Sequence, residues 1–167
     1  DGFVFSSAKI LVVENSQRGV EVKKVTTYDV RVGDHIVIAA KDYNYALSTN
    51  QKSNNRGQAA IEKSGEIISF DSDVQILTVK EGMVAGTFAF YTGSGYLYAA
   101  STSKNYLKTE SALTANSSWA ISIATDGTAT IEAQGSNTKN VMQYNQQSSL
   151  FACYGSASQK AIVIYRL

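Results

Sequence analysis

Residues 86–134 read GTFAFYTGSGYLYAASTSKNYLKTESALTANSSWAISIATDGTATIEAQ, and this stretch carries the pattern that decides the fold. An apolar run at 87–91 is followed by a turn at 93–95, a returning run at 96–100, a third run at 105–109 and a fourth that starts at Trp119. Short β-branched and aromatic runs separated by Gly, Ser and Asn are typical of strands joined by tight turns. The stretch therefore predicts a unit of four strands.

The same order of runs occurs before and after this stretch, which predicts three such units. Two sets of residues recur at intervals of roughly 45 to 50 positions, namely Val74, Trp119 and Ile162, and Tyr45, Tyr96 and Val141. One unit cannot bury its apolar face alone, whereas three units can close a shared core and leave few sheet edges. We expect an all-β chain folded as a β-trefoil of three four-stranded units, with the extra length of the first unit in loops at 50–65. The alternative is a β-sandwich, which also uses many short strands.

The first 31 residues belong to no repeat. Their apolar runs, with Gly19 at a turn, predict a β-hairpin or two strands. An isolated hairpin is marginal in water, so this segment must dock on its own chain or on another molecule. We expect a strand-forming extension at 1–31 and a β-trefoil domain at 32–167. The residues expected to mediate assembly through the extension are Phe3, Phe5, Ile10 and Val12.

Composition limits the partners of the chain. Its 167 residues are 44% hydrophobic and 17% charged, with a net charge of +1. Such a chain can bury a core, and its scattered Lys and Arg residues do not form the basic patch that nucleic acid requires. No apolar run approaches the roughly 20 residues that span a bilayer. We expect neither a nucleic-acid partner nor a membrane span.

Few residues are suited to catalysis or metal binding. The single cysteine, Cys153, excludes a disulfide within the chain, and its alternating apolar context predicts a small buried side chain. The single histidine, His35, stands at a strand start, where a turn or core role is commoner than a catalytic one. One His and one Cys exclude ordinary zinc ligand sets, and residues 71–73 (Asp-Ser-Asp) fit a turn better than a calcium site. We expect no enzymatic activity, no metal and no cofactor.

Tyrosine and asparagine on the predicted turns favour binding of sugars. Sugar rings stack on aromatic faces, while Asn and Arg supply directional hydrogen bonds to hydroxyl groups. The candidate ligand-binding residues are Tyr43, Asn54, Asn55, Arg56, Tyr98, Tyr106, Tyr144 and Asn145. Arg56, in a predicted polar loop at 50–57, is the strongest directional donor. The alternative for each tyrosine is a role in capping the barrel, and Trp119 is expected in the core.

Four motifs carry a resemblance to a known kind of domain: GYLYAAS (95–101), YLKT (106–109), NSSW (116–119) and SLFACY (149–154). Together they resemble a poorly characterised domain of secreted bacterial surface proteins, which is appended to extracellular hydrolases, nucleases and lipoproteins. The resemblance covers residues 30–167, brings no catalytic motif, and implies an extracellular or cell-surface location. Lectins of the ricin-B type are similar in architecture alone, because their Gln-x-Trp signature is absent here.

These observations predict a non-catalytic extracellular module that binds carbohydrate or another cell-surface ligand through its Tyr- and Asn-rich hairpin loops. The alternative is a structural subunit of an extracellular fibre, pilus or surface layer. In that case the strands at 1–31 would add to a sheet edge of a neighbouring subunit, giving self-association.

Overall fold

The computed structural model describes residues 12–13, 20–21, 23–24 and 30–167. Nearly all of its regular structure is β-strand. The elements are β1 (Val12–Val13), β2 (Val20–Glu21), β3 (Lys23–Lys24), β4 (His35–Ala40), β5 (Tyr45–Lys52), β6 (Asn55–Ser64), β7 (Ile67–Phe70), β8 (Leu77–Glu81), β9 (Phe88–Tyr91), β10 (Tyr96–Ala100), β11 (Tyr106–Glu110), the short 3₁₀ helix η1 (Ala115–Ser117), β12 (Trp119–Ile123), β13 (Thr128–Ala133), β14 (Val141–Asn145), β15 (Leu150–Tyr154) and β16 (Ile162–Arg166).

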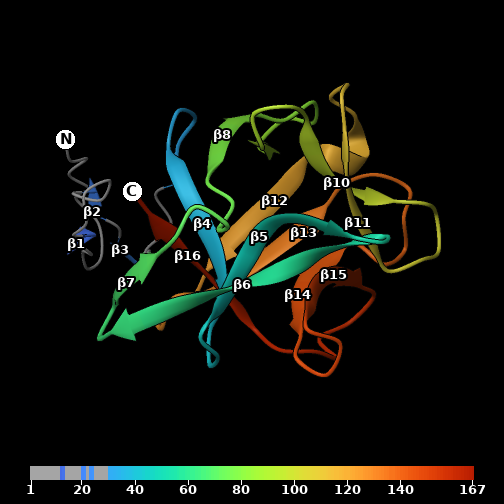
Figure 1. Cartoon of the computed structure of the whole chain (residues 1–167). Helices are drawn as coiled ribbons and strands as arrows, with labels where there is room; N and C mark the ends of the chain where they lie inside the picture. The colour runs from blue at the N-terminus through green and yellow to red at the C-terminus, as the bar shows by residue number, and fades with distance from the viewer. Residues whose placement is uncertain (1–11, 14–19, 22, 25–29) are drawn as a thin grey trace.

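Strands β4, β8, β9, β12, β13 and β16 form a closed barrel (Figure 1). Each pairs antiparallel with the next, and β16 returns to β4. Closure satisfies the hydrogen-bonding groups along both edges of every barrel strand, which an open sheet would leave exposed. Two barrel strands come from each of the three units.

Three hairpins, β5–β6, β10–β11 and β14–β15, supply the second and third strands of the three units. They meet one another at one end of the barrel: β15 pairs with β6, the Leu107 amide donates to the Asn54 carbonyl (3.0 Å), and the Cys153 amide donates to the Asn105 carbonyl (3.3 Å). A six-stranded barrel capped by three hairpins is a β-trefoil. The predicted all-β trefoil is confirmed, and the β-sandwich alternative is not.

The predicted repeat holds at one of its two sets of positions. Tyr45, Tyr96 and Val141 each begin the second strand of their unit, as expected. In the other set, Trp119 and Ile162 begin the fourth strands, but the corresponding residue of the first unit is Leu77 rather than Val74. Val74 lies before β8 and bridges to Ser48.

The extra length of the first unit is folded as strand rather than loop, which corrects the prediction for residues 50–57. β5 runs to Lys52 and β6 begins at Asn55, with Ser53 at the turn in the left-handed region (φ 57°). β6 then continues beyond the cap and pairs with β7, and β7 pairs with β3. The result is a ribbon of β6, β7 and β3 that the other two units lack.

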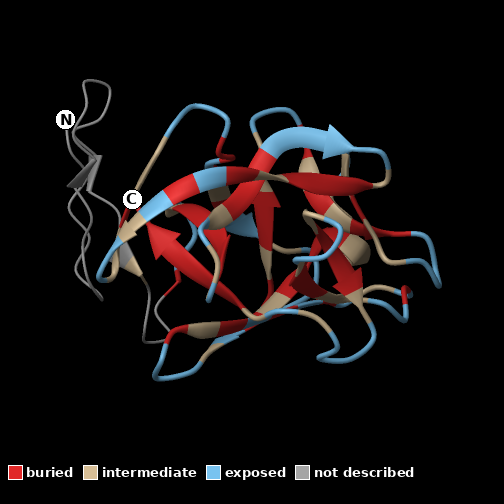
Figure 2. Ribbon diagram, turned by 60° about the horizontal axis from the view of Figure 1, so that its bottom comes forward, coloured by how far each residue is buried: buried red, intermediate tan, exposed pale blue. Residues whose placement is uncertain are grey.

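This ribbon covers the outer face of the barrel beside β4 and β16. Alternate residues of β4 point to opposite sides of the strand, so Ile36 and Ile38 enter the barrel core while Val37 and Ala39 face outward. The outward pair packs in a second apolar cluster with Ile68 of β7. Burial on both faces explains why β4 reads as a continuous apolar run. Figure 2 shows that most buried residues lie on strands and that most of the connecting loops are exposed.

The N-terminal segment is described in part. Lys23 and Lys24 pair with β16 of the same chain, and β1 pairs with β2. Of the four residues expected to mediate assembly, Val12 lies in β1, whereas Phe3, Phe5 and Ile10 lie outside the described residues. Assembly through this segment and the division of the chain at residue 31 stay predictions.

Trp119 lies at the centre of the barrel core, as expected from its alternation with Ile121. It has no solvent exposure, its indole Nε1 donates to the Leu97 carbonyl (3.1 Å), and its ring centroid lies 6.0 Å from that of Phe90. The indole therefore packs against β9 and is joined to β10 of the second hairpin by a hydrogen bond.

We expect Trp119→Ala to lower the free energy of unfolding by about 3–5 kcal/mol, because it leaves a large cavity and an unpartnered carbonyl. Urea denaturation followed by far-UV circular dichroism measures the change. The control Val32→Ala removes an apolar side chain that is 56% exposed, and should change stability by less than about 0.5 kcal/mol. Equal effects of the two substitutions would contradict the placement of Trp119.

Candidate functional site

The outer face of the second hairpin carries three tyrosines. In the β10–β11 ladder, Tyr96 stands opposite Glu110, Tyr98 opposite Lys108, and Ala100 opposite Tyr106. Directly opposed residues share a face of the sheet, and alternate residues along a strand do so too. Tyr96, Tyr98 and Tyr106 therefore lie on one face, each half-buried. The intervening residues Leu97, Ala99 and Leu107 are fully buried against the core.

The aromatic surface continues onto the barrel through Tyr91 of β9. Tyr91 pairs with Tyr96, and their ring centroids are 5.3 Å apart at an interplanar angle of 56°. The Tyr91 hydroxyl donates to the Gly93 carbonyl (3.0 Å), which fixes the ring beside the β9–β10 turn. We call Tyr91, Tyr96, Tyr98 and Tyr106 the tyrosine strip.

A lysine lies over each end of the strip. The Lys80 ammonium is 5.5 Å from the ring centroid of Tyr91, and the Lys108 ammonium is 5.8 Å from that of Tyr106. Lys108 also donates to the Asn54 Oδ1 atom (3.3 Å) at the β5–β6 turn. Cations at these distances are attracted by the negative face of an aromatic ring. The strip therefore combines exposed aromatic surface with positioned hydrogen-bond donors.

Three of the eight predicted ligand-binding residues meet at this site: Asn54, Tyr98 and Tyr106. Tyr98 and Tyr106 belong to the strip itself. Asn54 joins from a different unit, through its contact with Lys108. The structure thus brings these three predicted residues together on a surface that spans the first and second units, and their role in ligand binding stays a prediction.

Asn55 and Arg56 lie beneath the cap rather than on its surface, which corrects their predicted role as ligand contacts. They are 8% and 5% exposed. Asn55 Oδ1 accepts from the Leu107 amide (2.9 Å). The Arg56 guanidinium donates to the Ser48 carbonyl (2.9 Å) and to Thr109 Oγ1 (3.2 Å), so its fork is used to hold β11 against the first unit. These neutral partners do not offset its desolvation, and burial lowers the pKa of Arg56.

Tyr144 is a core residue, which corrects its predicted role as well. It is 1% exposed, and its hydroxyl donates to Gln58 Oε1 (2.6 Å). Burial raises the pKa of its hydroxyl group. Tyr43 and Tyr45 pack their half-buried rings against it, with centroids at 5.6 and 6.3 Å. These aromatic rings seal the junction of the first and third units.

Asn145 serves the β14–β15 turn. Its Oδ1 accepts from the Ser148 amide (2.9 Å), and its Nδ2 donates to the Tyr154 hydroxyl (2.9 Å). Both ends of the side-chain amide are therefore engaged within the third unit, away from the residues that surround Tyr98.

The three hairpins are not equivalent on their outer faces. In the third unit, Gln143 stands at the outward position of Tyr98 and is buried. In the first unit, Leu47 points into the core, and the outward residues Ala46 and Ser48 are buried as well. Gln143 donates to the Ser156 carbonyl (2.8 Å) and accepts from the Gln159 amide (2.8 Å), so the loop after β15 covers that face. The second hairpin alone of the three presents a row of half-exposed tyrosines.

The predicted set of ligand-binding residues omits Tyr91, Tyr96, Lys80 and Lys108. Tyr96 could have been included from the sequence, because it stands two residues before Tyr98 in the same predicted strand and therefore shares its face. Lys80 and Tyr91 come from β8 and β9, which approach the second hairpin as the barrel closes. No local sequence pattern reports that approach.

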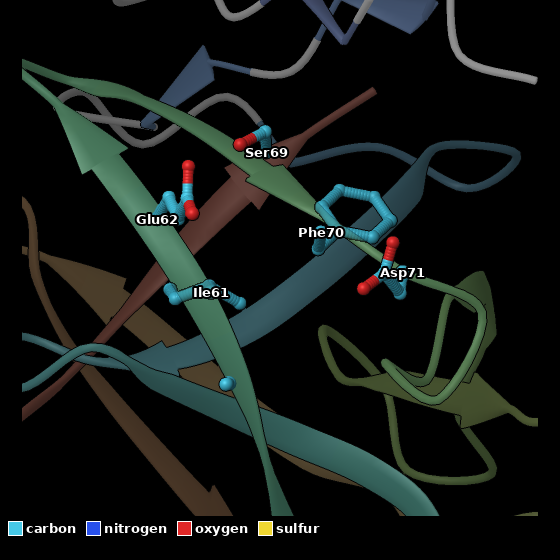
Figure 3. A pocket seen from close by; sticks show the side chains of 6 residues that line it. Ile61, Glu62, Ser69, Phe70 and Asp71 are labelled. Atoms are coloured by element: carbon cyan, nitrogen blue, oxygen red, sulfur yellow. The ribbon is translucent and has the colours of Figure 1, made fainter. Parts of the chain in front are cut away.

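A separate hollow of about 290 Å³ lies on the ribbon of the first unit (Figure 3). Its lining residues come from β6 and from the end of β7: Ala60, Ile61, Glu62, Ser69, Phe70 and Asp71. Glu62 stands opposite Ser69 in the ladder. The carboxylates of Glu62 and Asp71 make this hollow acidic, in contrast to the lysine-flanked strip.

Groups suited to catalysis are scattered over the described part of the chain. Within residues 30–167 and the short N-terminal strands, no three His, Cys, Asp or Glu side chains are grouped so as to hold a metal ion. His35 Nδ1 lies 3.3 Å from Thr78 Oγ1. The Asp71 carbonyl accepts from the Val74 amide (3.2 Å), as in the turn predicted at 71–73. None of the described segments is a helix long and apolar enough to cross a membrane.

The sequence matches no protein-family profile and no curated protein. Solved structures nevertheless share its fold. The β-trefoil BEL matches with a TM-score of 0.63 at 9% identity, covering 86% of this chain and 100% of that one. SeviL, solved with asialo-GM1 saccharide bound, matches with a TM-score of 0.58 at 10% identity, covering 80% and 97%.

A GH43 β-1,3-galactosidase matches with a TM-score of 0.63 at 12% identity over 86% of this chain, which spans 29% of that enzyme. Identities this low show the fold alone. The fold and the comparisons define the class as a β-trefoil. SeviL, solved with a saccharide bound, has a similar fold.

We expect Arg56→Ala to lower the free energy of unfolding by about 2–3 kcal/mol, because several hydrogen bonds between the first and second units are lost. Arg56→Lys should recover little of this stability, since an ammonium cannot reproduce the planar fork. Thermal and urea denaturation measure both variants. Lys52→Ala, at an exposed neighbour in the same hairpin, is the control; an Arg56→Ala protein as stable as this control would refute the role.

Cys153 should be inert in the folded protein. Its side chain has no solvent exposure, and burial raises the pKa of its thiol, so the reactive thiolate is scarce. We expect labelling by a thiol-specific disulfide reagent at pH 8 to be at least about a hundredfold slower in the native protein than in guanidinium chloride, because attack requires opening of the core. Comparable rates in the two conditions would contradict this placement.

Proposed function

We propose that this protein is a non-catalytic carbohydrate-binding module that holds a saccharide on the tyrosine strip. The observation that carries the proposal is the row of half-exposed rings at Tyr96, Tyr98 and Tyr106 on the outer face of the second hairpin. A pyranose ring presents a C–H face that packs on an aromatic ring, with dispersion and electrostatic attraction acting together. Two or more neighbouring rings can bind successive sugar units.

Polar groups around the strip suit the hydroxyl groups of a sugar. Asn54 and Lys108 flank Tyr106 on one side, and the Thr92 and Ser94 hydroxyls lie at the turn beside Tyr91. A bound saccharide can exchange hydrogen bonds with such groups while its apolar face covers the rings. Small ligands of this kind are typically fixed by a few polar groups beside an apolar floor.

The comparisons support this proposal at the level of the fold. SeviL binds the asialo-GM1 saccharide on a similar fold, and the galactosidase contains a similar domain within a longer chain that acts on a glycan. We propose an extracellular or cell-surface location, where complex glycans are displayed. Residues 30–167 resemble a domain of secreted bacterial proteins. We include in the proposal that the chain is a domain of this kind. A structural role in a fibre or surface layer depends on residues 1–31 and stays an untested alternative.

A glycan array tests the proposal, followed by titration calorimetry with a bound member. We expect binding by the wild-type protein and a loss of about tenfold in affinity for Tyr98→Ala, which corresponds to roughly 1.4 kcal/mol of lost stacking. Tyr98→Phe should retain most of the affinity, because the ring remains.

The matched control is Tyr154→Ala, which removes a half-buried tyrosine from the third hairpin. It should leave affinity unchanged, and circular dichroism establishes that each variant is folded. Absence of binding to any saccharide, or equal losses for Tyr98→Ala and Tyr154→Ala, would overturn the proposal.

A further inference from the structure

We infer that the saccharide bound by the tyrosine strip carries a negative charge, such as a carboxylate or a sulfate. This inference rests on the proposed function and specifies its ligand. Its basis is the charge distribution around the strip, where an ammonium group lies over a ring at each end and little negative charge opposes it.

Neither ammonium group forms an ion pair with a residue that the structure describes. The side-chain ion pairs found among the described residues involve Lys41 and Arg166, and not Lys80 or Lys108. Lys80 is exposed, and Lys108 is held in place by the Asn54 side chain. An ammonium donates three hydrogen bonds, so Lys108 retains donors after its contact with Asn54. Both groups are available to an anion of the ligand.

The carboxylates near the strip are engaged or point elsewhere. Glu110 shares the face of Tyr96, but it accepts a hydrogen bond from the Thr114 hydroxyl. Glu81 follows Lys80 in β8, so its side chain leaves the opposite side of the strand. Residues 82–107, which include all four tyrosines of the strip, contain Lys104 as their one charged residue. The local charge is therefore positive, although the net charge of the chain is +1.

An anion at this surface contributes selectivity more than affinity. Exposed charge pairs are weak and are screened by salt with a Debye length of about 10 Å at 0.1 M. The rings then supply most of the binding energy for neutral and acidic saccharides alike, and the lysines distinguish between them. This separation gives two measurable signatures: a preference for acidic saccharides that fades with salt, and neutral binding that does not.

The experiment compares lactose, 3′-sialyllactose and 3′-sulfolactose by titration calorimetry, together with an array that carries neutral, sialylated and sulfated forms of the same cores. At 50 mM NaCl we expect the acidic members to bind about five- to tenfold more tightly than their neutral counterparts, and to lose this advantage at 1 M NaCl. The sialylated and sulfated arms identify whether carboxylate or sulfate is preferred.

The double variant Lys80→Gln with Lys108→Gln should abolish the advantage, so that acidic and neutral saccharides bind with equal affinity at 50 mM NaCl, while loss of the Lys108 hydrogen-bond donor weakens both alike. The control is Lys160→Gln, an exposed lysine of the third unit, which should preserve the advantage. Equal binding of neutral and acidic forms by the wild type, or an advantage that survives in the double variant, would overturn this inference and leave the proposed function intact. Failure of every saccharide to bind would overturn both.

Discussion

Closure of the six-stranded barrel is the constraint on which the rest of the structure depends. No unit buries its apolar side alone, so Trp119 of the second unit, Leu47 of the first and Phe151 of the third share one core. Once the barrel closes, the hairpins must pack together over its end, and the Arg56 and Asn55 side chains connect the first to the second. This packing sets the position of the tyrosine strip, because the opposite face of the same hairpin is buried against the core.

The fold was predictable because the sequence contains the same order of apolar runs and turns three times. Tyr45, Tyr96 and Val141 mark the same strand start in each unit. The polar stretch at 50–57 misled the prediction for a physical reason. Its side chains lie on a long hairpin whose outer residues are solvated, while Arg56 turns inward to neutral hydrogen-bond acceptors. Polarity alone does not distinguish such a strand from a loop.

The candidate site was predictable in part. Tyr98 and Tyr106 stand out by residue type, but their partnership depends on the β10–β11 register, and Lys80 and Tyr91 reach the site from other barrel strands. Tyr144 shows the converse case: its ring resembles a ligand platform in sequence, yet it is buried against Phe151 with its hydroxyl bound to Gln58. Whether a tyrosine faces solvent or core is decided by one residue of register, because a strand alternates its faces.

The unequal outer faces of the three hairpins have a consequence for valency. The outward residues of the other two hairpins, Ala46 and Ser48 in the first and Gln143 in the third, are buried. Under the proposed function, the three hairpins of the described chain therefore offer one docking surface, on the second hairpin. A ligand held there gains nothing from rebinding at sister sites on the same molecule, so cross-linking of decorated surfaces requires several copies of the chain to be joined.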